Sequence, residues 1–197
     1  HIQGDGREYV ISDSTAQKLR SEDGRFVKDV DISLFINDLP NKKNTTCFST
    51  EDASGSTSQA AGIVEGIEAQ SHVFLLDEDT SATNFMVRDA FMQRVISREK
   101  EPITPFLERA RDLYEKAGIS TILVAGSSGA FFHIADTVIQ MDNYKPVDIT
   151  EKAKKLCEDY PLNDSDAPVF QMPKSHRVMT KTEATTHGKK DYYGHFK

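Results

Sequence analysis

The sequence predicts an α/β fold with a mostly parallel sheet, because two short apolar runs follow one another with a helical pattern between them. Residues 72–76 and 119–125 are apolar stretches of strand length, which is typical of strands buried on both faces of a sheet. Residues 104–117 carry an apolar stripe at helical spacing and are followed by Gly118, a common helix terminator. Parallel strands need a crossover connection, usually a helix, so this order favours a parallel sheet covered by helices.

Length and composition set the outer limits of the fold. The 197 residues suffice for one sizeable core, or for one domain followed by a tail. We expect a domain over residues 1–159, and a linker with a basic tail over residues 160–197, where the composition changes. The chain does not begin with Met and has no signal peptide, so we interpret it as a piece of a longer protein, or as one whose beginning was removed.

Charge, cysteine content and hydropathy exclude several classes of protein. The formal net charge of -7 argues against a protein that coats nucleic acid, although a local basic patch remains open. Only Cys47 and Cys157 are present, so no disulfide framework is implied and a reducing compartment is expected, the cytoplasm or an organelle matrix. No apolar run reaches the roughly 18 residues of a membrane span, so we expect no membrane partner.

A Ser/Thr/Gly-rich stretch precedes a helical pattern that begins at Ser58. Such a helix start leaves backbone N–H groups unpaired, and together with the positive end of the helix dipole these groups form an anion site. Taken alone, a flexible linker or a plain helix cap is the more frequent explanation. The residues of this stretch are Ser54, Gly55, Ser56 and Thr57.

Three acids, Asp77, Glu78 and Asp79, directly follow the first apolar run. In open α/β sheets the carboxyl ends of the strands face the crevice where ligands bind. In P-loop nucleotidases the first acid after such a strand holds Mg²⁺, directly or through water, and the next orients or deprotonates the attacking water. The alternative is the solvated start of a loop.

The remaining elements are expected from turn residues, caps and periodicity. In the first half of the chain these are a strand at residues 8–12, a helical turn at 13–20 capped by Asp13 or Ser14, a turn at 22–25 with Gly24, and a strand at 45–50. In the second half they are a helix at 88–99, a helix capped by Thr104 with Pro105 in its first position, a strand at 135–142, and a helix at 151–159 capped by Thr150.

The order of these motifs resembles that of ATP-binding-cassette (ABC) ATPases. Residues 77–84, Asp-Glu-Asp-Thr-Ser-Ala-Thr-Asn, are similar to the Walker B motif and D-loop, with Asp79 where the family usually has proline. Ser54 and Gly55 match two positions of the Leu-Ser-Gly-Gly-Gln signature, which also opens a helix leading into the Walker B strand. More narrowly, the segments that resemble the predicted ABC-class ATPase family are residues 37–40, 45–59, 77–85 and 100–106.

This resemblance implies a P-loop nucleotidase-like three-layer sandwich, here part of a nucleotide-binding domain, that binds ATP and Mg²⁺ between the two subunits of a homodimer. It implies that Asp77 supports Mg²⁺ and that Glu78 polarises the attacking water. Residues 54–57 would face the γ-phosphate bound by the other subunit. The segment that would couple the two sites consists of Ser81, Ala82, Thr83 and Asn84. Transport is not implied.

Two features depart from the ABC pattern. The Walker A sequence, Gly-X-X-X-X-Gly-Lys-Ser/Thr, is absent from these residues, so we do not expect this chain to bind ATP tightly alone. The position of the switch histidine falls on Gly126 or Ser127, which makes Ser127 a candidate hydrogen-bond donor to the γ-phosphate or the water. His133, farther along, is expected to be structural, and residues 22–25 are only a positional candidate for the Q-loop.

Two other functions remain to be weighed. A serine hydrolase is disfavoured because the stretch from Gly126 to Gly129 lacks the Gly-X-Ser-X-Gly spacing of a nucleophile elbow. The basic residues and aromatics at 174–197 are a candidate RNA contact, although a solvated extension is the more frequent explanation. The alternative to an ATPase is therefore an RNA- or protein-binding module that keeps the scaffold without hydrolysis.

Overall fold

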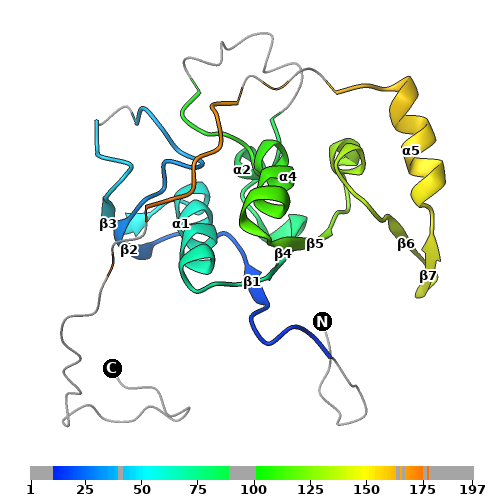
Figure 1. Cartoon of the computed structure of the whole chain (residues 1–197), viewed down its shortest axis with the longest axis horizontal. Coiled ribbons are helices and arrows are strands. Elements are labelled where there is room, and N and C mark those ends of the chain that lie inside the picture. The colour runs from blue at the N-terminus through cyan, green and yellow to red at the C-terminus, as the bar shows by residue number, and fades with distance from the viewer. Residues whose placement is uncertain are drawn as a thin grey trace.

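The computed structural model describes residues 11–39, 42–88, 101–162, 165, 167–174 and 177. Its centre is a three-stranded sheet in the order β1 (Gln17–Leu19), β4 (Val73–Asp77) and β5 (Ser120–Val124). Both pairings are parallel, and β4 lies in the middle (Figure 1). The predicted α/β fold with a parallel sheet is confirmed, and the acid-bearing run is its central strand.

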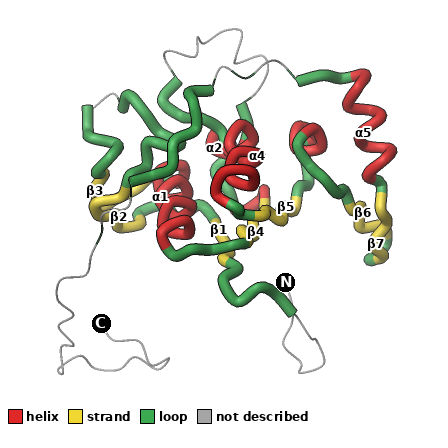
Figure 2. Tube along the Cα trace, in the orientation of Figure 1, coloured by secondary structure: helices red, strands yellow, loops and turns green. Residues whose placement is uncertain are grey.

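Helix α1 (Gly55–Glu68) covers one face of this sheet and runs back to the start of β4. Phe74 and Leu76 alternate with half-buried residues along β4 and are themselves buried. A Cβ atom added to Gly66 of α1 would lie 2.6 Å from the Phe74 ring, so this helix approaches the strand as closely as glycine allows. The close packing fixes the start of α1 near the carboxyl end of β4 (Figure 2).

Strand β5 is more exposed than the sequence predicts. Its Ile122 and Val124 are 61% and 65% exposed, and Ile122 lies in register with Leu75 on the face opposite Phe74. Among the described residues, β5 is an edge of the sheet, and α1 and α4 (Phe106–Ala117) both lie on the other face (Figure 1). The apolar pattern was interpreted correctly as a strand but wrongly as a buried one.

The N-terminal part forms a hairpin that the sequence only half predicts. Strands β2 (Arg25–Val30) and β3 (Phe48–Ala53) pair antiparallel with two irregularities of register. A strand was expected at residues 45–50, where β3 lies, but none was expected at β2. The helical turn expected at residues 13–20 is wrong, since this segment contains β1. Asp13 instead accepts hydrogen bonds from the backbone N–H and hydroxyl of Thr15, at 2.7 and 2.5 Å.

Helix α4 ends at Gly118 as predicted, with φ at +69° in the left-handed region. Its N-cap is Pro105, one residue later than the expected Thr104. Tyr114, one of the apolar residues of the stripe predicted over residues 104–117, is exposed. Arg109 is buried and donates to the carbonyl oxygens of Leu34 and Pro168. The helix therefore turns an arginine inward, because main-chain acceptors on two sides satisfy its guanidinium.

The strand expected at residues 135–142 is shorter and does not extend the parallel sheet. Strand β6 (Ile139–Asp142) pairs antiparallel with β7 (Lys145–Asp148), through a turn in which Asn143 and Tyr144 both have positive φ. Helix α5 (Thr150–Asp159) follows as predicted, but Ile149 occupies its N-cap. Thr150 instead accepts a hydrogen bond from the N–H of Val138.

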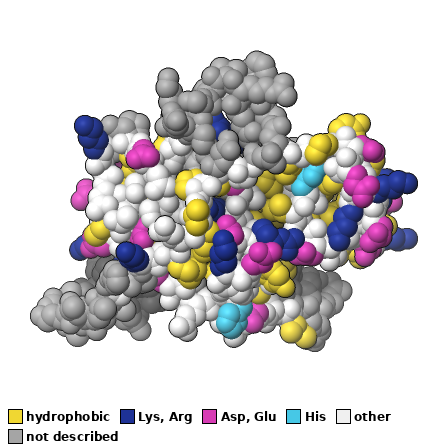
Figure 3. Space-filling view, turned by 45° about the horizontal axis from the view of Figure 1, so that its top comes forward, with side chains coloured by type: hydrophobic (Ala, Val, Ile, Leu, Met, Phe, Trp, Pro, Cys, Tyr) yellow, Lys and Arg dark blue, Asp and Glu magenta, His cyan; other side chains and the backbone are white. Residues whose placement is uncertain are grey.

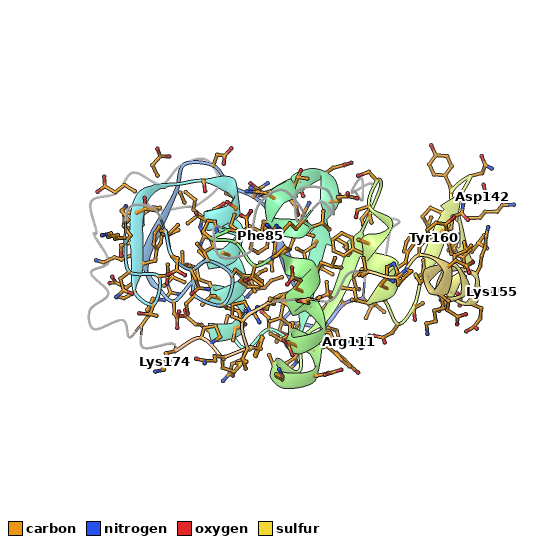
Figure 4. The ribbon with its side chains drawn as sticks, turned by 90° about the horizontal axis from the view of Figure 1, so that it is seen from above. Phe85, Arg111, Asp142, Lys155, Tyr160 and Lys174 are labelled. Atoms are coloured by element: carbon orange, nitrogen blue, oxygen red, sulfur yellow. The ribbon has the colours of Figure 1, made fainter. Side chains whose placement is uncertain are left out.

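The described C-terminal residues return across the molecule and pack on it. Phe170 is buried in the main core, and the N–H of Lys174 donates to buried Asp31 at 2.9 Å. Figure 4 shows Lys174 at the opposite end of the molecule from Tyr160, the C-cap of α5. The division of the chain at residue 159 stays a prediction. The expected features that lie outside the described residues are most of the strand at 8–12, the helix at 88–99 beyond Arg88, and the tail from residue 178.

Candidate nucleotide-hydrolysis site

The candidate site lies where β4 and β5 end side by side. Asp77 is the last residue of β4 and lies in register with Val124, the last residue of β5. Glu78 begins the short 3-10 helix η1 (Glu78–Thr80), and the loop with Ser127 follows β5. The structure therefore brings three predicted residues, Asp77, Glu78 and Ser127, to one edge of the sheet.

Glu78 is held by four hydrogen bonds from the loop after β5. Its Oε2 accepts from the backbone N–H groups of Gly126, Ser127 and Ser128, at 2.8, 3.0 and 3.4 Å. Its Oε1 accepts from the hydroxyl of Ser127 at 2.6 Å. These donors stabilise the charged carboxylate, the Ser127 hydroxyl most strongly, and lower the pKa of Glu78 to about 2. Glu78 is therefore ionised at neutral pH, with a fixed orientation.

Asp77 anchors the segment that follows it and keeps one carboxylate oxygen open. Its main-chain oxygen accepts from the hydroxyls of Thr80 and Ser81, at 3.3 and 2.8 Å, and its Oδ1 accepts from the N–H of Asp79 at 3.2 Å. Within the described ranges, no donor is hydrogen-bonded to Oδ2. Asp77 is half-buried, and a free carboxylate oxygen suits a hard cation that binds through one carboxylate, waters and phosphate oxygens, as Mg²⁺ does.

The described part of the chain holds no cluster of three or more His, Cys, Asp or Glu side chains able to bind a metal ion. A site made by protein ligands alone, as for structural Zn²⁺, is therefore not found there. The donor set around Asp77 fits Mg²⁺ that is held in part by a nucleotide.

The predicted anion site forms the start of α1. Ser54 is the N-cap, and its hydroxyl accepts from the N–H of Thr57 at 3.4 Å, as predicted for a helix start. Ser54 Oγ also lies 3.4 and 3.0 Å from the hydroxyls of Ser56 and Thr57, so three hydroxyls gather there. A Cβ on Gly55 would lie 2.2 Å from Ser21 Oγ and 3.0 Å from Asp23 Oδ1, so Gly55 admits the turn after β1.

The D-loop-like segment divides into a fixed and an exposed part. Ser81 and Ala82 are both hydrogen-bonded to Gln59 of α1, a residue that our sequence interpretation did not single out. Thr83 and Asn84 begin the short helix α2 (Thr83–Met86) and are exposed. In the sequence, Gln59 could have been noticed as a polar residue beside Ala60 and Ala61 on the apolar side of a helix. That pattern points to a role for Gln59 only once its burial is known.

A groove of about 680 Å³ runs beside β5, but it is not lined by the two acids. Its walls come from α4, β5 and residues 131–139, and it ends at Ala125, next to the loop that holds Glu78. Hydrophobic side chains reach the surface between the centre of the molecule and its α5 end (Figure 3). His133, in the 3-10 helix η3 (Gly129–His133), lines a second apolar groove against α5.

Two comparisons with known proteins bear on this arrangement. A family model described as ABC_ATPase, P-loop domain, matches residues 1–178. The chain is also 31% identical over 147 residues to a Methanocaldococcus jannaschii protein named "Uncharacterized protein MJ1628". That alignment covers 74% of this chain and 32% of the relative, so the chain spans about a third of the relative's length.

The described helices include none with the length and apolar character that a membrane crossing requires. The family model covers most of the chain, including all the candidate site residues, and agrees with the parallel sheet and its central acid-bearing strand. The chain therefore belongs to the ABC ATPase family of nucleotide-binding P-loop domains.

Proposed function

We propose that this chain supplies the acid-bearing part of a site that hydrolyses ATP with Mg²⁺, in a role other than transport. The proposal rests on the hydrogen bonds by which the loop after β5 holds the Glu78 carboxylate, directly beside Asp77. A carboxylate fixed by several donors at the carboxyl end of a central strand is pre-organised to bind one water molecule in one orientation.

In this proposal Glu78 orients the attacking water. Each carboxylate oxygen can accept more than one hydrogen bond, so Oε1 can still accept from water beside the Ser127 hydroxyl. A carboxylate whose pKa lies at about 2 is a weak base at neutral pH. Its main contribution is then to align and polarise the water, while Ser127 keeps the carboxylate in place.

Asp77 would hold Mg²⁺ through Oδ2, directly or through water. Mg²⁺ held there would supply positive charge that stabilises the phosphate oxygens of the nucleotide. The chain's own contribution is to fix Asp77, which it does by tying the Asp77 carbonyl to Ser81 and Thr80.

We also propose that the site is completed across a homodimer. The hydroxyls of residues 54–57 and the unpaired N–H groups of α1 would contact the γ-phosphate of a nucleotide held by the partner. Thr83 and Asn84 are exposed and are available for contact with that partner.

The test is ATP hydrolysis by the full-length protein, comparing wild type with Glu78→Gln. We expect kcat to fall by at least about 100-fold while ATP-dependent pairing of subunits is retained, because the amide cannot polarise water as a carboxylate does. Asp79→Asn is the matched control, since it removes the neighbouring exposed charge and should leave kcat within about threefold.

Equal rates for wild type and Glu78→Gln would rule out the ATPase proposal. They would leave the alternative, an RNA- or protein-binding module on the same scaffold. Of the basic residues expected to bind RNA, the described Arg177 is paired with Glu68 and Glu65. This observation does not favour the alternative.

A further inference from the structure

Gln59 is a fully buried polar side chain inside α1, with a relative exposure of 0%. It lies one turn from the hydroxyls at residues 54–57, and neighbouring Ala60 and Ala61 are equally buried. A buried amide is costly unless each of its polar atoms is satisfied, so its partners show what it does.

Both ends of the Gln59 amide are bonded to the segment that follows the acids. Its Nε2–H donates to Ser81 Oγ at 2.9 Å, and its Oε1 accepts from the N–H of Ala82 at 2.9 Å. The hydroxyl of Ser81 in turn donates to the carbonyl oxygen of Asp77 at 2.8 Å. Two consecutive hydrogen bonds, through the Ser81 hydroxyl, therefore link α1 to the residue proposed to hold Mg²⁺, and a third holds the neighbouring Ala82.

The donors and acceptors in these hydrogen bonds require a side chain at position 59 that can both donate and accept, as glutamine can. Ser81 has one hydroxyl proton, which it gives to Asp77, so Ser81 must receive a hydrogen bond from α1. Ala82 offers an N–H, so the same side chain must also accept. A carboxylate at position 59 lacks the donor, and an apolar side chain lacks both groups.

A second connection links the same turn of α1 to η1. Ser58 Oγ accepts from the N–H of Glu22 at 2.9 Å, and the N–H of Ser21 donates to the carbonyl oxygen of Thr80 at 2.9 Å. Residues 58 and 59 of α1 thus hold residues 80–82 from two sides. The start of α1 is therefore tied to the segment that follows the acids by both side-chain and main-chain hydrogen bonds.

We propose that Gln59 is a positioning residue that couples the start of α1 to Asp77 and Glu78. Contact of residues 54–57 with a phosphate then sets the placement of the acids in the same subunit, and this inference rests on the proposed ATPase function. Gln59 is fully buried, away from the surface that a nucleotide would reach. It acts through Ser81 and Ala82.

The experiment measures steady-state ATP hydrolysis by the full-length protein for wild type, Gln59→Met, Ser81→Ala and the double variant. Methionine keeps the length and volume of the side chain but makes neither hydrogen bond. We expect Gln59→Met to lower kcat about tenfold, because misplacing a catalytic group by a fraction of an ångström is costly, and to leave the KM for ATP within about twofold. Ser81→Ala should act alike, and the double variant should be no slower than the slower single variant, since both break one connection.

Ile63→Val is the control for a merely structural role. Ile63 is equally buried on α1 and belongs to the core cluster, so the change loosens the packing of the helix and keeps the hydrogen bonds to residues 80–82. It should lower the melting temperature and leave kcat unchanged. The inference is overturned if Gln59→Met affects kcat no more than Ile63→Val does, or if the effects of Gln59→Met and Ser81→Ala multiply.

The two proposals fail in different ways. If the kcat of wild type exceeds that of Glu78→Gln but equals that of Gln59→Met, only the coupling role of Gln59 is refuted. If wild type and Glu78→Gln have the same kcat, the proposed ATPase function is refuted. The coupling role depends on that function and is then refuted as well.

Discussion

At the scale of single residues, the site depends on how donors are arranged around one carboxylate. Glu78 gains three backbone N–H groups and one hydroxyl from a loop that begins 48 residues later in the chain. Sequence reasoning named Glu78 and Ser127 separately, as a water-polarising acid and as a substitute for the switch histidine. It did not place them in contact, because nothing local in the sequence shows which two loops meet.

Replacing Ser127 with alanine should raise the pKa of Glu78 from about 2 towards its ordinary value of 4.5, because the Ser127 hydroxyl is the largest cause of the lowering. A lowered pKa in the folded state stabilises the protein above pH 4.5, and that stabilisation is lost as the pH falls towards 2. The free energy of unfolding of wild type should therefore depend more steeply on pH in this window than that of Ser127→Ala.

The measurement is the carboxyl ¹³C chemical shift of Glu78 against pH, in metal-free protein. Ser128→Ala is the control, since Ser128 contacts Glu78 through its N–H alone, at 3.4 Å. An unchanged titration midpoint in Ser127→Ala would contradict the contact.

At the scale of elements, the pairing of α1 with β4 positions the site. Gly62 and Gly66 lie one turn apart on α1, and in the sequence both are simply helix-weakening residues. The structure separates them: a Cβ on Gly66 meets the Phe74 ring at 2.6 Å, whereas a Cβ on Gly62 has its nearest neighbour, Arg25 Nη1, at 3.5 Å.

The same substitution should therefore have opposite effects at the two glycines. Gly66→Ala should lower the free energy of unfolding by about 1–3 kcal/mol, since overpacking pushes α1 away from β4. Gly62→Ala should raise it by up to about 1 kcal/mol, because alanine favours the helix and meets ordinary contacts. Urea unfolding of the two variants tests this pair, and a destabilised Gly62→Ala would contradict the packing described.

The elements that the sequence predicted well are those whose signal is local. A few neighbouring residues are enough to predict the helix cap at Ser54, the left-handed helix end at Gly118 and the apolar strand β4. Strand β1 was missed because three residues of mixed character become a strand only by pairing with β4. Gln59 was missed for the same reason, since its partners lie 22 and 23 residues away.

At the scale of the whole molecule, the C-terminal segment joins parts that are distant in sequence. Phe170 is 8% exposed and lies 6.0 Å from the guanidinium carbon of Arg109 and 5.2 Å from Nζ of Lys116, measured from the ring centroid. Beyond it, Lys174 and Arg177 bond to Asp31 and Glu68. Composition predicted a linker with a basic tail over this segment, because it contains few apolar residues. A single buried side chain such as Phe170 produces no periodic pattern in the sequence.

Phe170→Ala should lower the free energy of unfolding by about 3 kcal/mol, as for other buried aromatic side chains that are truncated. Val169→Ala is the control, since Val169 is 81% exposed and its loss should change stability by less than about 0.5 kcal/mol. Chemical unfolding of both variants is the measurement. Equal stabilities would mean that the segment does not pack on the core.

The exposed outer edge of β5 has a consequence for how this chain behaves in solution. Among the described residues β5 has no strand on its outer side, so it presents a row of main-chain donors and acceptors, flanked by exposed Ile122 and Val124. Such a margin is a template on which another polypeptide can lay a strand. Where that edge is uncovered, we expect copies of this chain to pair with one another along it.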